Sequence, residues 1–85
     1  MNRFYRWSLR LHREVVGTLY KMPRPAVEDT WKVLRSLEID PYPEEASQVE
    51  GHEHTYQIQT NGYRIVYELL VDEGAIKILR LHLVG

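Results

Sequence analysis

The sequence predicts an α+β fold in which a helical hairpin covers one face of an antiparallel sheet. The stretch 55–71, TYQIQTNGYRIVYELLV, places Asn61-Gly62 between two runs of alternating apolar residues. An Asn-Gly pair in this setting is typical of a two-residue β-hairpin. Two earlier segments repeat apolar residues at spacings of three and four, as amphipathic helices do. The stretch 75–85, AIKILRLHLVG, supplies a third strand after the hairpin.

The length and composition limit what this chain can be. Its 85 residues correspond to a single domain, 1–85, with one modest core. It has no cysteine, and its net charge is −1, so overall charge gives no case for nucleic-acid binding. The start of the chain lacks the apolar core of a signal peptide, and no apolar run is long enough to cross a membrane. We therefore expect a cytoplasmic protein.

The N-terminal half predicts a strand followed by two helices. Residues 3–8 are rich in aromatic side chains that favour a strand. Residues 9–22 carry a helical stripe that ends before Pro23, comprising Leu11, Val15, Leu19 and Met22. Arg24-Pro25 then opens a second helix that stops at Asp40-Pro41, and its stripe comprises Val27, Trp31, Leu34 and Leu37. Residues 44–54 are acidic and irregular, so we interpret them as a connector.

The two-residue turn fixes the register of the hairpin and separates its two faces. Ile58 then pairs with Ile65, and Gln59 pairs with Arg64. The core face carries Tyr56, Ile58, Ile65, Tyr67 and Leu69. The opposite, open face carries Thr55, Gln57, Gln59, Arg64, Val66 and Glu68.

The third strand is placed by the loop that precedes it. A three-residue loop, Asp72-Glu73-Gly74, pairs Leu79 with Tyr67 and Leu81 with Ile65, and it puts Ile78 on the open face. A loop of two or four residues would bury Ile76 and Ile78, but it would also bury Arg80 and His82 at high cost. We therefore favour the three-residue loop, which gathers Gln59, Arg64, Arg80 and His82 on the open face.

These elements, and the motifs NGYRIVYEL and ILRLH, resemble the RelE/ParE superfamily of toxin–antitoxin toxins. The resemblance covers the whole chain, and the arginine of the first motif is Arg64. Arg80, Leu81 and His82 resemble the end of the RelE/YoeB-like mRNA interferases. The resemblance implies a strand–helix–helix–meander fold and a type II toxin that represses translation by cleaving mRNA on the ribosome.

The resemblance also implies roles for individual side chains in RNA cleavage that uses the 2′-hydroxyl and needs no metal or other cofactor. Glu44 or Glu45, after Pro43, is the positional match for the general base. Arg64 and Arg80 would hold the phosphate through planar, forked donors. Imidazole is suited to proton transfer near neutral pH, so His82 is the candidate general acid. On the second strand, Gln57 and Gln59 are candidate substrate contacts.

Two departures from the family pattern keep other functions open. The second strand has uncharged Thr55, Gln57 and Gln59 where many RelE-type ribonucleases carry lysine or arginine, and Leu83 stands where a tyrosine is expected. The alternatives are a ParE-like inhibitor of DNA gyrase that cleaves nothing, and a member without catalysis that only binds an antitoxin-like partner. His52 and His54 lack a third ligand at convincing spacing, so no metal site is predicted.

The implied partners follow from the same resemblance. A basic open face beside an apolar helical hairpin suits an acidic amphipathic helix, the usual form of an antitoxin tail in this family. The interferase reading adds the ribosome and mRNA. Exposed aromatic residues near the N-terminus are compatible with a homodimer.

Overall fold

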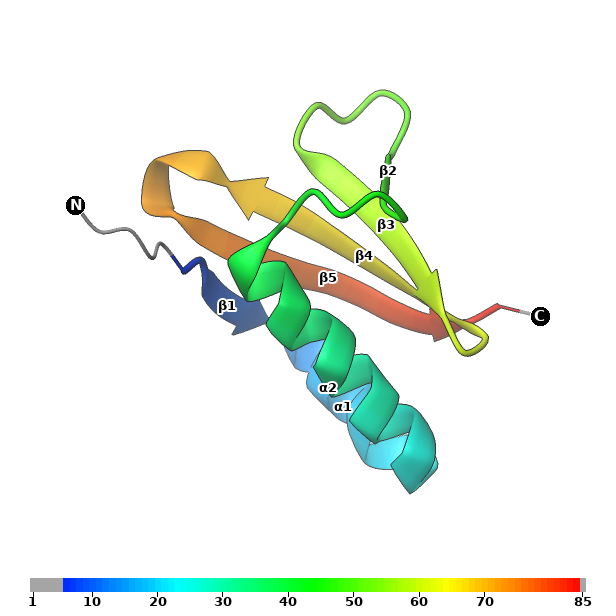
Figure 1. Ribbon diagram of the computed structural model, residues 1–85. Coiled ribbons are helices and arrows are strands. Elements are labelled where there is room, and N and C mark those ends of the chain that lie inside the picture. Colours follow the sequence, from blue (N-terminus) through cyan, green and yellow to red (C-terminus); the bar gives the residue numbers. More distant parts are fainter. Residues whose placement is uncertain (1–5, 85) are drawn as a thin grey trace.

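A computed structural model describes residues 6–84 and shows two helices packed on one side of a five-stranded sheet (Figure 1). In chain order the elements are β1 (Ser8–Leu11), α1 (Arg13–Lys21), α2 (Arg24–Ile39), β2 (Ser47–Gln48), β3 (Thr55–Thr60), β4 (Tyr63–Leu70), the 3-10 turn η1 (Val71–Glu73) and β5 (Ala75–Leu83). The predicted α+β class is confirmed.

The sheet has the strand order β1-β5-β4-β3-β2, in which β1 runs parallel to β5 and the other neighbours are antiparallel. The connector was predicted to be irregular, but it contributes the two-residue strand β2, which pairs with β3. Residues 3–5 of the predicted first strand lie outside the described residues. The observed strand begins only at Ser8, where the predicted one ended.

The first helix begins four residues later than its apolar stripe predicted. Residues 9–11 continue β1, where their backbone pairs with β5. Because an apolar residue serves a strand and a helix equally well, the pattern alone did not separate the two. His12 caps the helix, since its Nδ1 accepts a hydrogen bond from the backbone N–H of Glu14 at 3.1 Å. The second helix begins at Arg24, as predicted.

The hairpin has the predicted register throughout, from Thr60 opposite Tyr63 to Thr55 opposite Glu68. Asn61 and Gly62 both have positive φ, at 48° and 81°, as a type I′ turn requires. Asn61 also donates a side-chain hydrogen bond to Asp29 of α2, so the turn is tied to the helical hairpin.

The register predicted for the third strand holds for only half of its length. Leu81 pairs with Ile65 and Leu83 with Tyr63, as predicted, but Tyr67 pairs with Ile78 and not with Leu79. A β-bulge between Val66 and Tyr67 shifts the register, so Leu79 is the extra residue on β5. The bulge places Ile76 and Ile78 in the core while Arg80 stays exposed. The prediction was wrong here because it assumed a three-residue loop and one register for the whole strand. Leu70 pairs with Ala75, so the loop has the four residues 71–74, and the bulge restores the predicted pairs from Arg80 onward.

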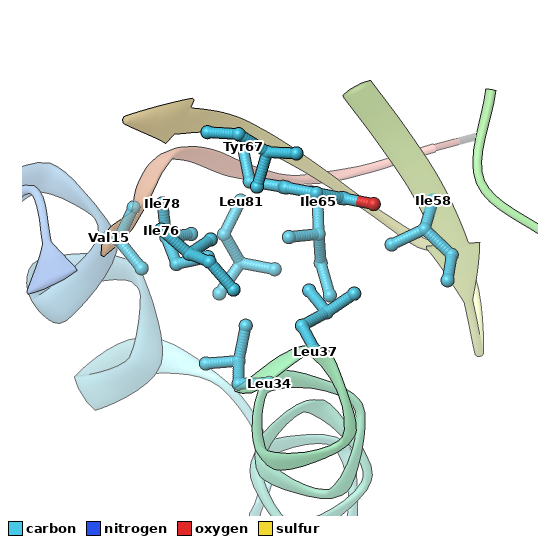
Figure 2. Packing of buried hydrophobic residues seen from close by; sticks show 10 residues of the cluster. Val15, Leu34, Leu37, Ile58, Ile65, Tyr67, Ile76, Ile78 and Leu81 are labelled. Carbon is cyan, nitrogen blue, oxygen red and sulfur yellow. The ribbon is translucent and has the colours of Figure 1, made fainter. Parts of the chain in front are cut away.

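The core lies between the sheet and the two helices. Figure 2 shows Leu34 and Leu37 of α2 directed toward Ile65 of β4, with Val15 of α1 beside the β5 residues Ile76 and Ile78. Tyr67 is completely buried in this layer. Its hydroxyl donates a hydrogen bond to the carbonyl of Pro41 at 2.9 Å, which fixes the start of the connector against the sheet.

Candidate functional site

The face of the sheet opposite the helices carries the predicted site residues. Along β4, Arg64, Val66 and Glu68 alternate with the buried residues Ile65, Tyr67 and Leu69. Within residues 6–84, both helices lie against the other face (Figure 1). The side chains of this open face are therefore available to a ligand.

The strand pairing brings the predicted site residues of three strands together. Gln59 of β3 is the partner of Arg64, and Arg64 is in turn the partner of His82 on β5. The next pairs along the same face are Gln57 with Val66 and Val66 with Arg80. Directly opposed residues have Cβ atoms about 4.5–5.5 Å apart, so the two arginines and the histidine share one continuous surface.

Two grooves border this face, and the first, here called the Arg64 groove, lies toward β2. It has a volume of about 130 Å³ and is lined by Glu45, Ser47, Gln57, Ile58, Gln59 and Arg64. Arg64 Nη2 donates to the side-chain oxygen of Gln59 at 3.5 Å, at the long limit of a hydrogen bond. Arg64 is half-buried and Glu45 is exposed. The groove therefore contains a guanidinium group that is partly shielded from solvent and a carboxylate that is in contact with solvent.

The two candidate bases differ in their placement. Glu45 lines the Arg64 groove, whereas Glu44 is exposed and is absent from the lining of that groove. The sequence left these neighbours undecided because both follow Pro43. Their positions relative to Arg64 depend on how the connector returns to the sheet. The anchor of that return, the bond between Tyr67 and Pro41, joins residues 26 positions apart.

The second groove, here called the β5-edge groove, lies between α1 and the C-terminal half of β5. It has a volume of about 400 Å³ and is lined by Glu14, Thr18, Arg80, Leu81 and His82. Sequence reasoning missed Glu14 and Thr18. Their spacing of four places them on one side of α1, but the pattern does not say which strand that side meets.

Burial raises the pKa of the Tyr67 hydroxyl above that of a free tyrosine, and the charges of Tyr56 and Asp40 act in the same direction. The group is therefore a neutral donor to Pro41 over the physiological pH range. In consequence Tyr67 holds the connector in place and is not available as an acid or base at the open face.

The chain also has features that bear on other kinds of site. In the described residues, no group of three or more histidine, aspartate or glutamate side chains is arranged to hold a metal ion. None of the helices in that range is both long and apolar enough to cross a membrane. A third groove, of about 310 Å³, lies between the helices and is lined by Leu11, Val16, Leu19, Tyr20, Val27 and Trp31.

This chain is similar to known proteins in its three-dimensional structure. No protein-family model matches the chain, and no curated protein matches its sequence. A chain of the archaeal RelE–RelB complex from Pyrococcus horikoshii OT3 aligns with a TM-score of 0.80 and 25% identity. That alignment covers 93% of this chain and 96% of the archaeal one.

Two bacterial structures give the same result. The isolated RelE toxin of E. coli aligns with a TM-score of 0.84 and 18% identity, over 93% of this chain and 85% of the toxin. The toxin–antitoxin complex RelBE2 from Mycobacterium tuberculosis contains a chain that aligns with a TM-score of 0.81 and 15% identity. That alignment covers 98% of this chain and 97% of the other. The resemblance seen in the sequence is confirmed in three dimensions: this chain has the fold of the RelE toxins.

Proposed function

We propose that this protein is the toxin of a type II toxin–antitoxin system, and that it is a metal-independent endoribonuclease that cleaves mRNA on the ribosome. The observation that carries the proposal is the shared surface of Arg64, Arg80 and His82, with the carboxylate of Glu45 in the Arg64 groove. Together with the RelE fold, this surface supplies each side-chain type that the reaction needs.

The proposed reaction is an internal transfer within the RNA. A carboxylate takes the proton of the 2′-hydroxyl, whose oxygen then attacks the adjacent phosphorus. Arg64 and Arg80 stabilise the charge that develops on the phosphate oxygens. The bond to the 5′-oxygen breaks, and His82 donates the proton that this leaving oxygen requires. The products are a 2′,3′-cyclic phosphate and a 5′-hydroxyl.

The geometry favours Glu45 over Glu44 as the base. Glu45 lines the same groove as Arg64, so a phosphate bound to Arg64 would lie near the carboxylate. Glu44 shares no groove lining with Arg64. The candidate substrate contacts Gln57 and Gln59 line that groove as well. As neutral amides they can donate to RNA or accept from it.

We also propose an antitoxin as the partner that holds the toxin inactive. The solved relatives include toxins in complex with their antitoxins. The groove between the helices of this chain is apolar, and at its rim the ring of Tyr20 is 87% exposed. An apolar groove of this kind suits the apolar face of an amphipathic helix. The exposed cations Lys21, Arg24 and Lys32 on the same helices suit acidic residues on that partner.

The second candidate function is inhibition of DNA gyrase without cleavage. The observation that favours it is the uncharged open face of β3, where Thr55, Gln57 and Gln59 offer no cation to RNA. Assays of gyrase supercoiling with the purified chain separate this function from RNA cleavage.

The test of the main proposal is inducible expression in bacteria of the intact chain and of Arg64→Ala, with growth scored and mRNA 5′ ends mapped. We expect growth arrest and new 5′ ends with the intact chain, and loss of both in the variant. Arg35→Ala is the matched control, because Arg35 is an exposed arginine on α2 away from the open face. It should arrest growth like the intact chain.

The other outcomes assign the protein differently. Arrest without new 5′ ends would reject the ribonuclease proposal and favour gyrase. Retained cleavage in Arg64→Ala would reject the site. Soluble expression without any growth defect would leave a protein of the RelE fold that has no toxin activity.

A further inference from the structure

The C-terminal half of β5 is a sheet edge without a neighbouring strand. β1 pairs with β5 only from Ala75 to Ile78, and the N–H of His12 donates to the carbonyl of Ile78 at 3.0 Å. The chain then leaves the sheet to form α1. Among the described residues, no strand pairs with β5 from Leu79 to Leu83 on the side away from β4.

The direction of the backbone groups along this edge follows from the ladder with β4. The N–H of Val84 donates to the carbonyl of Gly62 at 2.7 Å, so position 84 is bonded toward β4. Bonding in an antiparallel pair alternates from one residue to the next. The N–H and carbonyl groups of Leu81 and Leu83 therefore point outward, away from β4. They form two successive docking positions for another extended chain.

The residues around the edge indicate which side chains a docked strand would carry. On the open face, the side chains of Arg80 and His82 flank the free backbone of Leu81. Within residues 6–84, neither side chain makes a hydrogen bond or an ion pair with another residue. On the core side, the β5-edge groove is lined by Leu81 and by Thr18, whose hydroxyl already donates to the carbonyl of Glu14 at 3.0 Å. Glu14 lines the same groove, and its negative charge disfavours acidic residues on this side. Acidic residues fit the first side, and apolar residues fit the second.

Charge also argues against a second copy of this chain at the edge. Two β5 edges paired with each other would bring the cationic Arg80 of both copies onto one face. Like charges on directly opposed strands destabilise a sheet. The groove is also open to solvent along α1, as a site for a single added strand requires.

We infer that the edge formed by Leu79–Leu83 binds an extended segment of a partner protein, in which acidic residues alternate with apolar ones, by adding a strand to the sheet. This inference rests on the proposed function only in naming the partner as the antitoxin. In that case the acidic side chains of the added strand lie beside Arg80 and His82 on the open face, and they compete with RNA phosphate for these residues. The helical groove on the other side of α1 is a separate contact.

The first experiment titrates the full chain with a short synthetic peptide in which glutamate alternates with valine, and follows amide hydrogen exchange by NMR. We expect protection of the amides of Leu81 and Leu83 at saturating peptide. A peptide with lysine in place of glutamate is the charge control, and it should bind at least tenfold more weakly. Protection centred on Val16 and Trp31 in its place would overturn the inference, because it would put the peptide between the helices.

The second experiment removes one outward N–H group. Leu83 is 68% exposed, and its N–H points away from β4, so Leu83→Pro removes a docking donor without breaking the internal ladder. We expect about tenfold weaker peptide binding, from the lost hydrogen bond and the steric bulk of the ring. Leu83→Ala is the matched control, since it shortens the side chain and keeps the N–H, and it should bind like the parent. Equal binding by the two variants would overturn strand addition.

The remaining outcomes would show that something other than an acidic partner segment occupies the edge, and they would overturn the inference. Protection of Leu81 and Leu83 that rises with protein concentration without peptide would show that a second copy occupies the edge. Protection by an RNA oligonucleotide but not by the acidic peptide would assign the edge to nucleic acid. Peptide binding does not depend on RNA cleavage. A chain that binds the peptide without being toxic would refute only the proposed function, and a toxic chain that ignores the peptide would refute only this inference.

Discussion

Arg64 and Ile65 are neighbours on β4, but their side chains lie on opposite faces of the sheet, one uncovered and the other covered by the helices. Ile65 is completely buried against α2, and its environment is filled by residues from the helices and from β5. Arg64 lies on the uncovered face, where its side chain donates a long hydrogen bond to Gln59. Alternate positions of one strand hold the fold together, and those between them face the ligand.

The largest effect is expected at the base of the proposed reaction. Glu45→Gln keeps the size of the side chain and removes its ability to take a proton. We expect RNA cleavage to fall by about 10²–10⁴-fold, the usual contribution of a general base. Glu44→Gln is the matched control and should change cleavage little. Single-turnover cleavage of mRNA in a ribosome assay measures both, and a larger loss in Glu44→Gln would transfer the role to Glu44.

On the covered face, Ile65→Ala should lower the free energy of unfolding by about 2–5 kcal/mol. The substitution removes buried methyl groups and leaves a cavity between β4 and α2. Arg64→Ala, one residue away, should change the free energy of unfolding by less than about 0.5 kcal/mol, since it removes a partly exposed side chain. Urea denaturation of the three proteins gives the comparison. Similar losses in both variants would mean that the open face is also structural.

How much of this was predictable differs between the faces. The register of the β3–β4 hairpin was fully predictable, because Asn61-Gly62 specifies the turn and the turn specifies every pair. The β4–β5 register was not, since a bulge at Val66 and Tyr67 changes the pairing partway along the strand. A bulge allows β5 to bury Ile78 and still expose Arg80. A prediction that applies one register to the whole strand either exposes Ile78 or buries Arg80.

The candidate site divides in the same way. The pair of Gln59 and Arg64 followed from the two-residue turn, so the sequence was sufficient for it. The predicted pair of Arg64 and His82 is also observed, but it depends on the bulge, which offsets a loop one residue longer than predicted. The positions of Glu45 and Thr18 depend on contacts between segments far apart in the chain, and no local pattern encodes them. The roles of all these side chains in RNA cleavage remain predictions.

A smaller effect on stability is expected from the buried hydroxyl group of Tyr67. Tyr67→Phe removes the hydrogen bond to Pro41 and leaves that carbonyl without its partner. We expect a loss of about 1 kcal/mol in the free energy of unfolding. Because the buried packing of the ring is kept, thermal or urea unfolding should remain cooperative. An unchanged stability would show that the anchor of the connector contributes nothing.

Tyr67→Phe should also change how the free energy of unfolding depends on pH in alkaline solution. Burial raises the pKa of Tyr67 in the folded state, so its contribution to stability is complete below the ordinary tyrosine pKa of about 10. It is lost as pH rises above that value, since the unfolded chain can ionise there and the folded one cannot. The stability of the parent should therefore fall more steeply above about pH 10 than that of Tyr67→Phe. Parallel curves would contradict the assigned cause.

The smallest effect tests whether the open face tolerates polarity. Val66→Thr keeps a β-branched side chain on β4 and adds a hydroxyl group that solvent can satisfy, so the free energy of unfolding should change by less than about 0.5 kcal/mol. Ile65→Thr adds the same group on the covered face, where helix α2 offers it no solvent, and it should be far more destabilising. Urea titrations of both variants measure the difference. If Val66→Thr lowered the free energy of unfolding as much as Ile65→Thr, the side chain of Val66 would have to be shielded from solvent, which would contradict an open face.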